Sequence, residues 1–274
     1  MKNLATYKND ICLIAGSGNF AYEAATYLNN RGNLKKIILL SKNTIIKKKF
    51  SKICTDHNIR DIEKIILELK NKNIKNIVIT GYVELPPIRE INLSLKSKFH
   101  LSKDFFLNDI NQQSLILKKF LNNKNLNLLS QKKIFKSFLI NKSDQSIKKD
   151  HKSIVLKILN NLSLIKKIFN LNIAQSLIMN GNRVLALEDF NGTDNLIKRV
   201  NSKKNILGEL IFIKSKKNNQ IDEIDFPVIG PNTINLLLEK KYKVICLFKN
   251  QSIVSNKIFF LNTIKNSNIS LLVI

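Results

Sequence analysis

Residues 11–32 read ICLIAGSGNFAYEAATYLNNRG and join a short apolar run to an amphipathic one through a glycine loop. ICLIA is typical of a buried strand, and AYEAATYLNNRG is typical of a helix that ends at Gly32. Gly16 and Gly18 stand where the strand passes into the helix, as in phosphate-binding loops. Three interpretations follow: the loop holds a nicotinamide cofactor, holds a nucleotide-bearing substrate, or simply turns the chain.

The same alternation continues beyond this stretch. KKIILLS, from Lys35, predicts a second strand, DIEKIILELKNKN, from Asp61, an amphipathic helix, and NIVITGYV, from Asn76, a third strand. Strands and helices in alternation predict a parallel sheet with helices on its faces. Ligands of such sheets bind at the carboxyl ends of the strands, where AGSGNF and TGYVELPP both fall. We therefore expect the two loops to face one crevice.

The second half has its own pattern of strands and helices. A polar, lysine-rich stretch at 124–150 marks the expected boundary between an N-terminal domain (1–130) and a C-terminal domain (150–274). A helix is predicted at 152–170, and Asn180-Gly181 between two apolar runs predicts a hairpin. Further strands are expected at LGELIFIK, DEIDFPVIG, KVICLF and ISLLVI, and further helices at GTDNLIKRV, NTINLLLEKK and 255–266. The predicted fold class is α/β, with a Rossmann-like parallel-sheet N-terminal domain followed by a mixed α/β C-terminal domain.

Composition limits the class of protein. The chain has 274 residues, 44% of them hydrophobic, which is typical of a globular protein. Lys or Asn interrupts every apolar run, so no membrane span is expected. The start, MKNLATYKND, lacks the pattern of a secretory signal, and a cytoplasmic location is predicted. The three cysteines and three histidines are scattered, which disfavours a zinc site, a redox pair or a histidine-based triad.

The net charge is strongly positive. Lys and Arg number 46 against 20 acids, giving +26. Lysine is spread along the chain together with Asn and Ile, as expected of a strongly AT-biased genome, whereas nucleic-acid binders usually concentrate charge in one patch. We therefore expect no nucleic-acid partner. Attraction to an anionic lipid surface or a phosphate-rich substrate is compatible with this charge.

Acids are scarce, and six of them fall in two groups near predicted strand ends: Glu188, Asp189 and Asp194, then Asp222, Glu223 and Asp225. Carboxylates brought together in this way are the usual ligands of Mg²⁺ or Mn²⁺, and they can activate water for attack on phosphorus. The alternative is that they are ordinary turn and cap acids, with Asp194 capping the helix that follows it.

The glycine loop fits a dinucleotide site only in part. Ala21 replaces the third glycine of G-x-G-x-x-G, which is an allowed variant. About 20 positions further on, where an acid would bind the ribose of NAD, the chain reads LLSKNTIIKKK. NAD is therefore disfavoured, while this basic strand end keeps an NADP-dependent oxidoreductase open.

Four segments in order resemble the UDP-2,3-diacylglucosamine pyrophosphatases of the lipid A pathway. LIAGSGNF is similar to the opening loop of that family, and TGYVELPP to its Gly-x-Val segment before a proline. LNIAQSLIMNGNRVLALEDFNGTDNLIKRV is similar to its central signature, and DFPVIGPNTI to its Asp-x-Pro-x-x-Gly-x-x-Thr block. The resemblance runs from Ile11 to the end of the chain.

The resemblance implies Mg²⁺-dependent hydrolysis of the diphosphate bond of UDP-2,3-diacylglucosamine to UMP and 2,3-diacylglucosamine 1-phosphate, with Mn²⁺ as a possible alternative to Mg²⁺. The C-terminal domain would be catalytic. Asp225 matches the essential aspartate, as a metal ligand or as the group that orients the attacking water. Glu188 and Asp194 would share the catalytic site, with Glu188 as a metal ligand beside Asp225. The substrate-binding positions implied are Gly16, Ser17, Gly18, Gly81, Gln175, Thr193, Gly230 and Thr233. The partners implied are a lipid-linked UDP-sugar and the anionic inner-membrane surface, where the protein would sit peripherally; the sequence leaves an oligomer open.

This chain also departs from the family pattern. The family usually has an acid at Asn191 and near Phe248, an aspartate at Asn172, a glycine at Ala174 and an arginine at Leu85. It usually has a Gly-Asp-Asp run where Gln112, Gln113 and Ser114 stand. A catalytically degenerate relative that binds a lipid or nucleotide is therefore the second alternative to the hydrolase.

Overall fold

The computed structural model describes residues 7–83, 90–92, 110–201 and 208–274. The chain divides into two compact units. The first comprises Met1–Lys136 and Ile221–Asp225, and the second comprises Ser137–Gln220 and Phe226–Ile274. Both units contain a five-stranded sheet with helices, so the predicted α/β class is confirmed.

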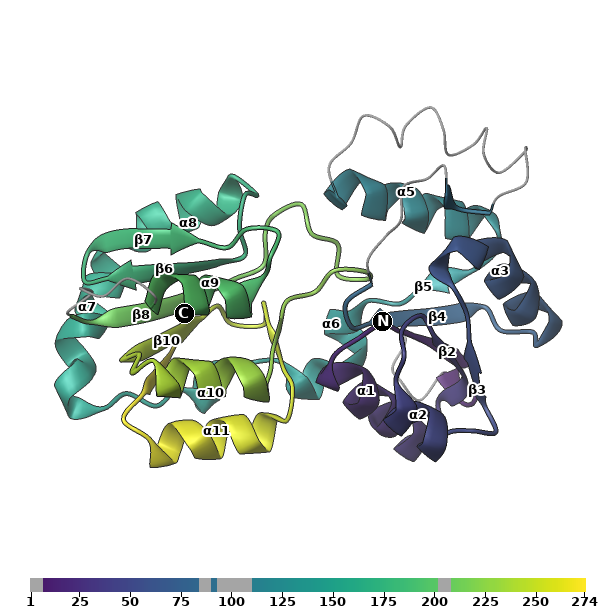
Figure 1. Ribbon diagram of the computed structural model, residues 1–274, viewed down its shortest axis with the longest axis horizontal. Helices are drawn as coiled ribbons and strands as arrows, with labels where there is room; N and C mark the ends of the chain where they lie inside the picture. The colour runs from purple at the N-terminus through teal and green to yellow at the C-terminus, as the bar shows by residue number, and fades with distance from the viewer. Residues whose placement is uncertain (1–6, 84–89, 93–109, 202–207) are drawn as a thin grey trace. The chain divides into compact units, whose positions relative to one another are not determined.

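The first unit is built on a parallel sheet with the strand order β3-β2-β1-β4-β5. Its elements in chain order are β1 (Ile11–Ala15), α1 (Asn19–Asn30), β2 (Leu34–Leu39), α2 (Thr44–Lys49), β3 (Cys54–Asp56), η2 (Ile59–Asp61), α3 (Ile62–Asn71), β4 (Asn76–Thr80), α5 (Ile110–Asn123), β5 (Asn127–Leu128) and α6 (Gln131–Ile134). In Figure 1, α1 and α2 lie on one face of the sheet, and α3 and α5 on the other. The Rossmann-like order places β1 and its glycine loop at the centre of the sheet.

Packing follows from the strand period of two. Cys12 and Ile14 on β1 point to the face that α3 and α5 cover, and they share a core with Ile65 and Phe120 of those helices. All five residues of β1 are buried, as expected of a central strand with helices on both faces. The apolar run ICLIA is therefore explained by its place in the sheet.

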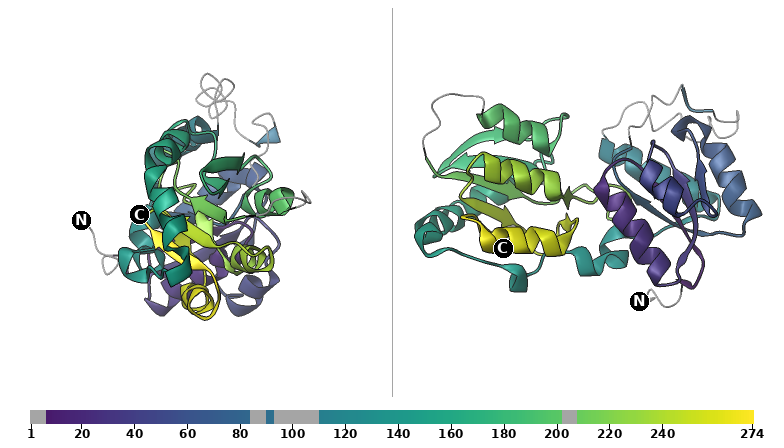
Figure 2. Two further views of the ribbon diagram at one scale, coloured as in Figure 1. Left: turned by 90° about the vertical axis from the view of Figure 1, so that its left-hand side faces the viewer. Right: turned by 60° about the horizontal axis from the view of Figure 1, so that its bottom comes forward.

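The second unit has a mixed sheet with the order β12-β10-β8-β6-β7. Its elements are η4 (Lys136–Phe138), η5 (Lys142–Asp144), η6 (Lys149–His151), α7 (Lys152–Asn160), α8 (Leu162–Asn170), β6 (Ser176–Asn180), β7 (Arg183–Leu187), α9 (Thr193–Asn201), β8 (Leu210–Lys214), β9 (Val228–Ile229), α10 (Pro231–Glu239), β10 (Val244–Leu247), β11 (Ile253–Val254), α11 (Lys257–Asn266) and β12 (Ser270–Val273). Strands β8, β10 and β12 are parallel, and β6 is antiparallel to β7 and β8. Helices α7 and α8 pack on one face and α9, α10 and α11 on the other, where Figure 2 shows them side by side.

Three sequence predictions need correction here. The helix expected at 152–170 is interrupted at Asn161 into α7 and α8. Only Val228–Ile229 of DEIDFPVIG forms a strand. The hairpin is confirmed, but Asn180 pairs with Arg183, so its two-residue turn is Gly181-Asn182, with Gly181 at φ +56°. The turn is shifted by one residue because Asn180 continues the strand.

Within the described part of the chain, no helix has the length and apolar character needed to cross a bilayer.

Candidate functional site

The glycine loop of the first unit is joined to the loop that follows β4. The Ser17 and Tyr82 backbones form an antiparallel bridge, with each amide 2.9 Å from the other's carbonyl oxygen. The Ser17 hydroxyl also donates to the Tyr82 carbonyl at 3.2 Å. Gly81 turns the chain at φ +81° and approaches Ser17 closely. The two loops that sequence analysis placed in one crevice are thus in direct contact.

This contact limits which amides can bind phosphate. The Gly16 amide donates to the Thr80 carbonyl at 2.8 Å, and the Ser17 amide is used in the bridge to Tyr82. Gly18 is the N-cap of α1, at φ +105°, with no side-chain cap bond and no acid in the first turn. A phosphate would therefore bind to the amides from Gly18 onward, and Gly16 and Ser17 would shape the loop.

Replacing Gly16 by alanine should destabilise the first unit by about 1–3 kcal/mol, because its Cβ would lie 2.3 Å from the Tyr82 carbonyl oxygen. Gly230→Ala is the matched control, since Gly230 has φ −128° and its nearest neighbour would be Ser255 Cβ at 3.8 Å. We expect the control to change the free energy of unfolding by less than about 0.5 kcal/mol. Urea unfolding measures both, and equal effects would contradict the close-approach explanation.

In the second unit, the turn between β7 and α9 is held by Asp189. Its carboxylate accepts the Asn191 amide at 2.9 Å and pairs with the Arg199 guanidinium, which also donates to the Leu187 carbonyl at 2.9 Å. The Asn191 amide, and then Arg199, hold the pKa of Asp189 below its usual value. Asp189 therefore stabilises the turn that brings Glu188 and Thr193 together.

Glu188 and Thr193 belong to a buried polar network at the ends of β7 and β8. The Thr193 hydroxyl donates to Glu188 Oε1 at 3.1 Å. The Lys214 ammonium donates to Thr193 Oγ1 at 2.8 Å and to Ser176 Oγ at 3.1 Å. Glu188 is 8% exposed and Lys214 2%. A buried lysine beside a buried glutamate makes a charge pair that solvent screens little.

One carboxylate oxygen of this network is unsatisfied. Glu188 Oε2 has no hydrogen-bond donor among the residues that the structure describes, and it lies 3.9 Å from Lys214 Nζ. A buried acceptor without a donor costs about 1–3 kcal/mol, so this oxygen would gain from binding a cation or a ligand donor. The oxygen fits Mg²⁺, which proteins usually hold through one or two carboxylates with substrate phosphates and water. The nearby ammonium partly offsets that fit, because it already supplies positive charge.

Asp194 and Thr233 connect the first turns of α9 and α10. The Thr233 hydroxyl donates to Asp194 Oδ1 at 2.7 Å, and Gly230 is the N-cap of α10. Thr193 and Asp194 are adjacent, so the first turn of α9 bonds Glu188 on one side and Thr233 on the other. Residues from three elements of the second unit are thus connected through this turn.

Gln175 lies just before β6, at the same edge of the sheet. Its carbonyl accepts the Ser215 amide at 3.0 Å, and its side-chain oxygen accepts from Gln220 at 3.2 Å. Because β6 is antiparallel to β8, its start lies beside the end of β8. Gln175 therefore shares the edge at which Ser176 and Lys214 bond to each other.

Asp225 is the last residue of the segment Ile221–Asp225, which belongs to the first unit. Gln131 binds this segment through its amide to the Asp222 carbonyl at 2.7 Å and through its side chain to the Ile224 carbonyl at 3.0 Å. Glu223 pairs with Lys118 at 3.1 Å. Asp225 thus belongs to one unit and Glu188 to the other, and a metal site shared by them stays a prediction.

The clustered acids do not form two ready metal centres. Among the described residues there is no group of three or more His, Cys, Asp or Glu side chains that could hold a metal ion. Asp189 pairs with Arg199, and Glu223 pairs with Lys118. Two of the six acids are therefore structural, as the turn-and-cap alternative predicts.

Several departures from the family pattern have visible structural roles. Asn172 sits at φ +60°, and its side-chain oxygen accepts the Asn219 amide at 3.0 Å, a bond that an aspartate would also make. Phe248 is buried and packs edge-to-face on Phe169 at 5.8 Å, so it supplies packing in place of a charge. Asn191 is exposed and Ala174 is buried. Leu85 and the side chains of Gln112 and Gln113 lie outside the described residues.

Sequence reasoning missed Lys214, Ser176 and Gln220. Lys214 is the last residue of the apolar strand LIFIK, and a lysine at the end of a buried strand could have indicated a functional residue. Its significance depends on the Glu188 carboxylate, which comes from a different strand and cannot be paired with it by spacing.

The described molecule is a two-domain α/β protein whose polar groups gather at strand ends, where such folds bind ligands. Residues 10–138 match the model of the LpxI N-terminal domain, and residues 142–272 match that of the LpxI C-terminal domain. The chain therefore belongs to the LpxI family, the UDP-2,3-diacylglucosamine pyrophosphatases, and membership supports a role in lipid A biosynthesis. No curated protein sequence matches the chain.

Proposed function

We propose that the protein hydrolyses the diphosphate bond of UDP-2,3-diacylglucosamine, releasing UMP and 2,3-diacylglucosamine 1-phosphate. The observation that carries this proposal is the match of both halves of the chain to the two LpxI domains. The buried network at the ends of β7 and β8 supports the proposal. It keeps the charged groups of Glu188 and Lys214 out of water, and Glu188 Oε2 has no hydrogen-bond donor among the described residues.

In this reaction the oxygen of water bonds to one phosphorus, and the bond between that phosphorus and the bridging oxygen breaks. The bridging oxygen stays on the other phosphate, and the protons of water pass to the product phosphates or to a base. Asp225 would orient the attacking water and accept its proton. Lys214 would place a positive charge beside the Glu188 carboxylate, and Thr193 would fix the orientation of that carboxylate through its hydroxyl. Asp225 and Glu188 would hold Mg²⁺, with Mn²⁺ as a second candidate, and the ion would neutralise phosphate oxygens and acidify water. Gln175, Gly230 and Thr233 would line the substrate site.

The deciding experiment incubates purified protein with the diacylated UDP-glucosamine, detergent and Mg²⁺ and measures UMP. UMP release that requires the metal is the expected result. No UMP with any of several divalent metals would overturn the hydrolase and favour a non-catalytic relative, an alternative that the buried, uncharged Phe248 supports. Tight NADPH binding without UMP release would instead favour the oxidoreductase.

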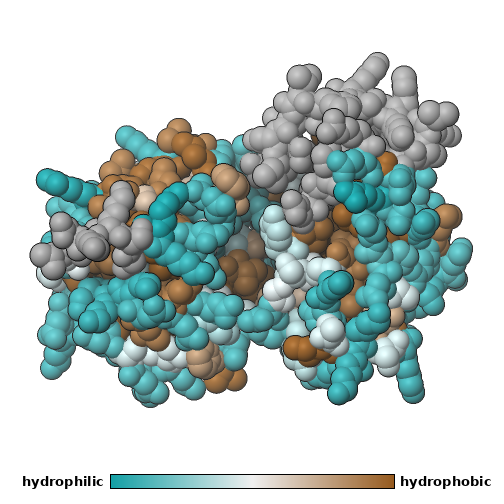
Figure 3. Space-filling view, viewed as in Figure 1, coloured by the Kyte–Doolittle hydropathy of each residue, from teal (hydrophilic) through white to brown (hydrophobic). Residues whose placement is uncertain are grey.

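We also propose that the protein works in the cytoplasm as a peripheral protein at an anionic membrane surface. The net charge of +26 supports this, since each basic residue near such a surface contributes about 1 kcal/mol. Leu164 on α8, and Leu171 and Ile173 after it, are 45%, 65% and 63% exposed. Figure 3 shows hydrophobic residues at the surface over α8 and β7. Apolar side chains beside lysines are suited to the headgroup boundary.

Replacing Leu171 and Ile173 together by serine should weaken binding to vesicles containing anionic lipid by about 10-fold, because two partly exposed apolar side chains lose their burial in lipid. Cosedimentation at physiological salt measures this change. The matched control replaces Leu67 and Ile45, which are exposed apolar residues of the first unit, together by serine. Binding that falls equally with the control would show that charge alone carries the association.

A further inference from the structure

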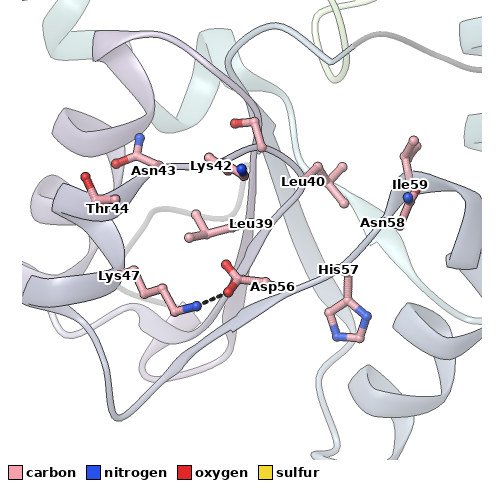
Figure 4. Close-up of a pocket in the computed structure, with 11 residues that line it drawn as sticks. Leu39, Leu40, Lys42, Asn43, Thr44, Lys47, Asp56, His57, Asn58 and Ile59 are labelled. Atoms are coloured by element: carbon pink, nitrogen blue, oxygen red, sulfur yellow. Dashed lines mark hydrogen bonds and ion pairs between the residues drawn. The ribbon is translucent and has the colours of Figure 1, made fainter.

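A cavity of about 570 Å³ lies within the first unit, at the carboxyl ends of β2 and β3. Figure 4 shows it between the loop that follows β2, with Asn43 and Thr44, and the segment that follows β3, with Asn58 and Ile59. Its volume is within the range of small-molecule sites. Neither the hydrolytic roles proposed above nor the packing of the sheet uses this cavity.

A backbone hydrogen bond connects the lining of the cavity to the strand that precedes the glycine loop. The Leu40 amide, just after β2, donates to the Ala15 carbonyl at the end of β1 at 2.9 Å, and Ala15 precedes Gly16. In parallel sheets of this strand order, a nucleotide whose phosphate lies at the loop after the first strand places its nucleoside beyond the second strand. The cavity lies beyond the end of β2, where that rule would place the nucleoside of a nucleotide whose phosphate is bound after Gly18.

Its lining combines apolar and polar groups. Leu39, Leu40 and Ile59 supply apolar surface of the kind that packs on a planar ring. Lys42 adds a positive charge that is exposed to solvent, and Lys47 is paired with Asp56. An apolar floor with a basic rim suits a nucleobase that carries a phosphate.

Two asparagine side chains of the lining are held in place by hydrogen bonds that their oxygens accept. Asn43 Oδ1 accepts the Ile46 amide at 3.0 Å, and Asn58 Oδ1 accepts the Arg60 amide at 3.0 Å. Each side chain therefore keeps its Nδ2 group as the remaining donor. Ser41 also lines the cavity, and its buried hydroxyl has no hydrogen-bond partner within the described residues.

His57 also lines the cavity, and its ring is held by Glu68. Its Nε2 lies 2.6 Å from Glu68 Oε2, and the buried Lys36 ammonium lies 2.7 Å from Glu68 Oε1. Burial alone would raise the pKa of Glu68, but hydrogen bonds from Lys36 and His57 outweigh it and hold the pKa below its usual value. Glu68 therefore fixes the orientation of the His57 ring at the edge of the cavity.

We propose that this cavity binds the uracil and ribose of the substrate's uridine nucleotide, with the 5′-phosphate directed to the amides after Gly18. The Nδ2 donors of Asn43 and Asn58 would complement the two carbonyl groups of uracil. Cytosine presents an amino group in place of one of these carbonyls. The assignment rests on the proposed function, which supplies the uridine nucleotide.

The test is titration of the full-length protein with UMP, without metal or lipid, by calorimetry. Asn58→Asp keeps the oxygen that accepts the Arg60 amide but removes the Nδ2 donor, and Lys42→Gln removes the charge at the rim. We expect each to weaken UMP binding at least 10-fold. The matched controls are Asn127→Asp, exposed at the opposite edge of the sheet, and Lys48→Gln, exposed on α2; they should stay within twofold.

The nucleotide series gives an independent readout. CMP should bind at least 10-fold more weakly than UMP, because the cytosine amino group would leave one of the two asparagine donors without an acceptor. No UMP binding at millimolar concentration, unchanged affinity in both cavity variants, or tighter binding of AMP, CMP or NADPH than of UMP would each overturn the proposal.

These experiments distinguish an error in the proposed hydrolase activity from an error in the proposed uridine site. UMP binding that depends on Asn58 and Lys42, with no hydrolysis, would leave the uridine site standing and remove the enzyme. Hydrolysis with an unchanged KM in both cavity variants would leave the enzyme standing and remove the uridine site.

Discussion

Asp225→Asn should lower the rate of UMP release by about 10²–10⁴-fold, the range expected when a group that takes a proton from water is lost. Asparagine keeps the size of the side chain but can neither accept the proton nor offer a charged oxygen to a metal. Asp225 is partly exposed at the end of a segment held by Gln131, so the substitution should leave the fold intact.

The measurement compares kcat for wild type, Asp225→Asn and the matched control Asp222→Asn. Asp222 is three residues away in the same segment, and its backbone carbonyl accepts the Gln131 amide, a bond that the substitution keeps. We expect the control to retain activity within about threefold. Equal losses in both variants would indicate a disturbed segment, and full activity in Asp225→Asn would remove this residue from the chemistry.

The sheet of the first unit could be predicted where strands are long and apolar. ICLIA, KKIILLS and NIVITGYV all correspond to strands, and the last ends at Thr80 because Gly81 takes a positive φ. Strands β3 and β5 and helix α2 were not predicted. They span three, two and six residues, which is too short for a periodic signal, and their positions depend on pairing with longer neighbours.

The candidate site could be predicted only in part from residue types. Because acids are scarce, both Glu188 and Asp189 were predicted as candidate ligands. The structure distinguishes them, since Asp189 pairs with Arg199 and Glu188 is buried. The resemblance, rather than the spacing, singled out Asp225. Lys214 was missed because its role arises from a partner on another strand.

The conformation of the glycine loop could also be predicted only in part from the sequence. Two glycines predicted a close approach and a turn, and both occur: Gly16 lies against Tyr82, and Gly18 takes a φ that favours glycine. The sequence could not show that the Gly16 and Ser17 amides are already bonded to the second loop. That contact moves the expected phosphate position toward the helix start.

Lys214→Met should destabilise the second unit by about 3–5 kcal/mol, because it leaves the buried Glu188 carboxylate without a compensating charge. Methionine has a similar length and fills the space without a donor, so the effect reports the lost charge and hydrogen bonds rather than a cavity. Lys157→Met is the matched control, since Lys157 pairs with Glu209 at 2.6 Å on a half-exposed surface. A pair of that kind contributes about 0–1 kcal/mol.

Adding Glu188→Gln to Lys214→Met should restore at least half of the lost stability, because the buried charge that had lost its partner is removed. Urea unfolding of the four combinations measures the coupling between the two residues. A loss in Lys214→Met no larger than in Lys157→Met would contradict a buried charge pair. If the double variant is stable but releases no UMP, the pair contributes more to catalysis than to folding, as expected for charges kept in a water-poor site.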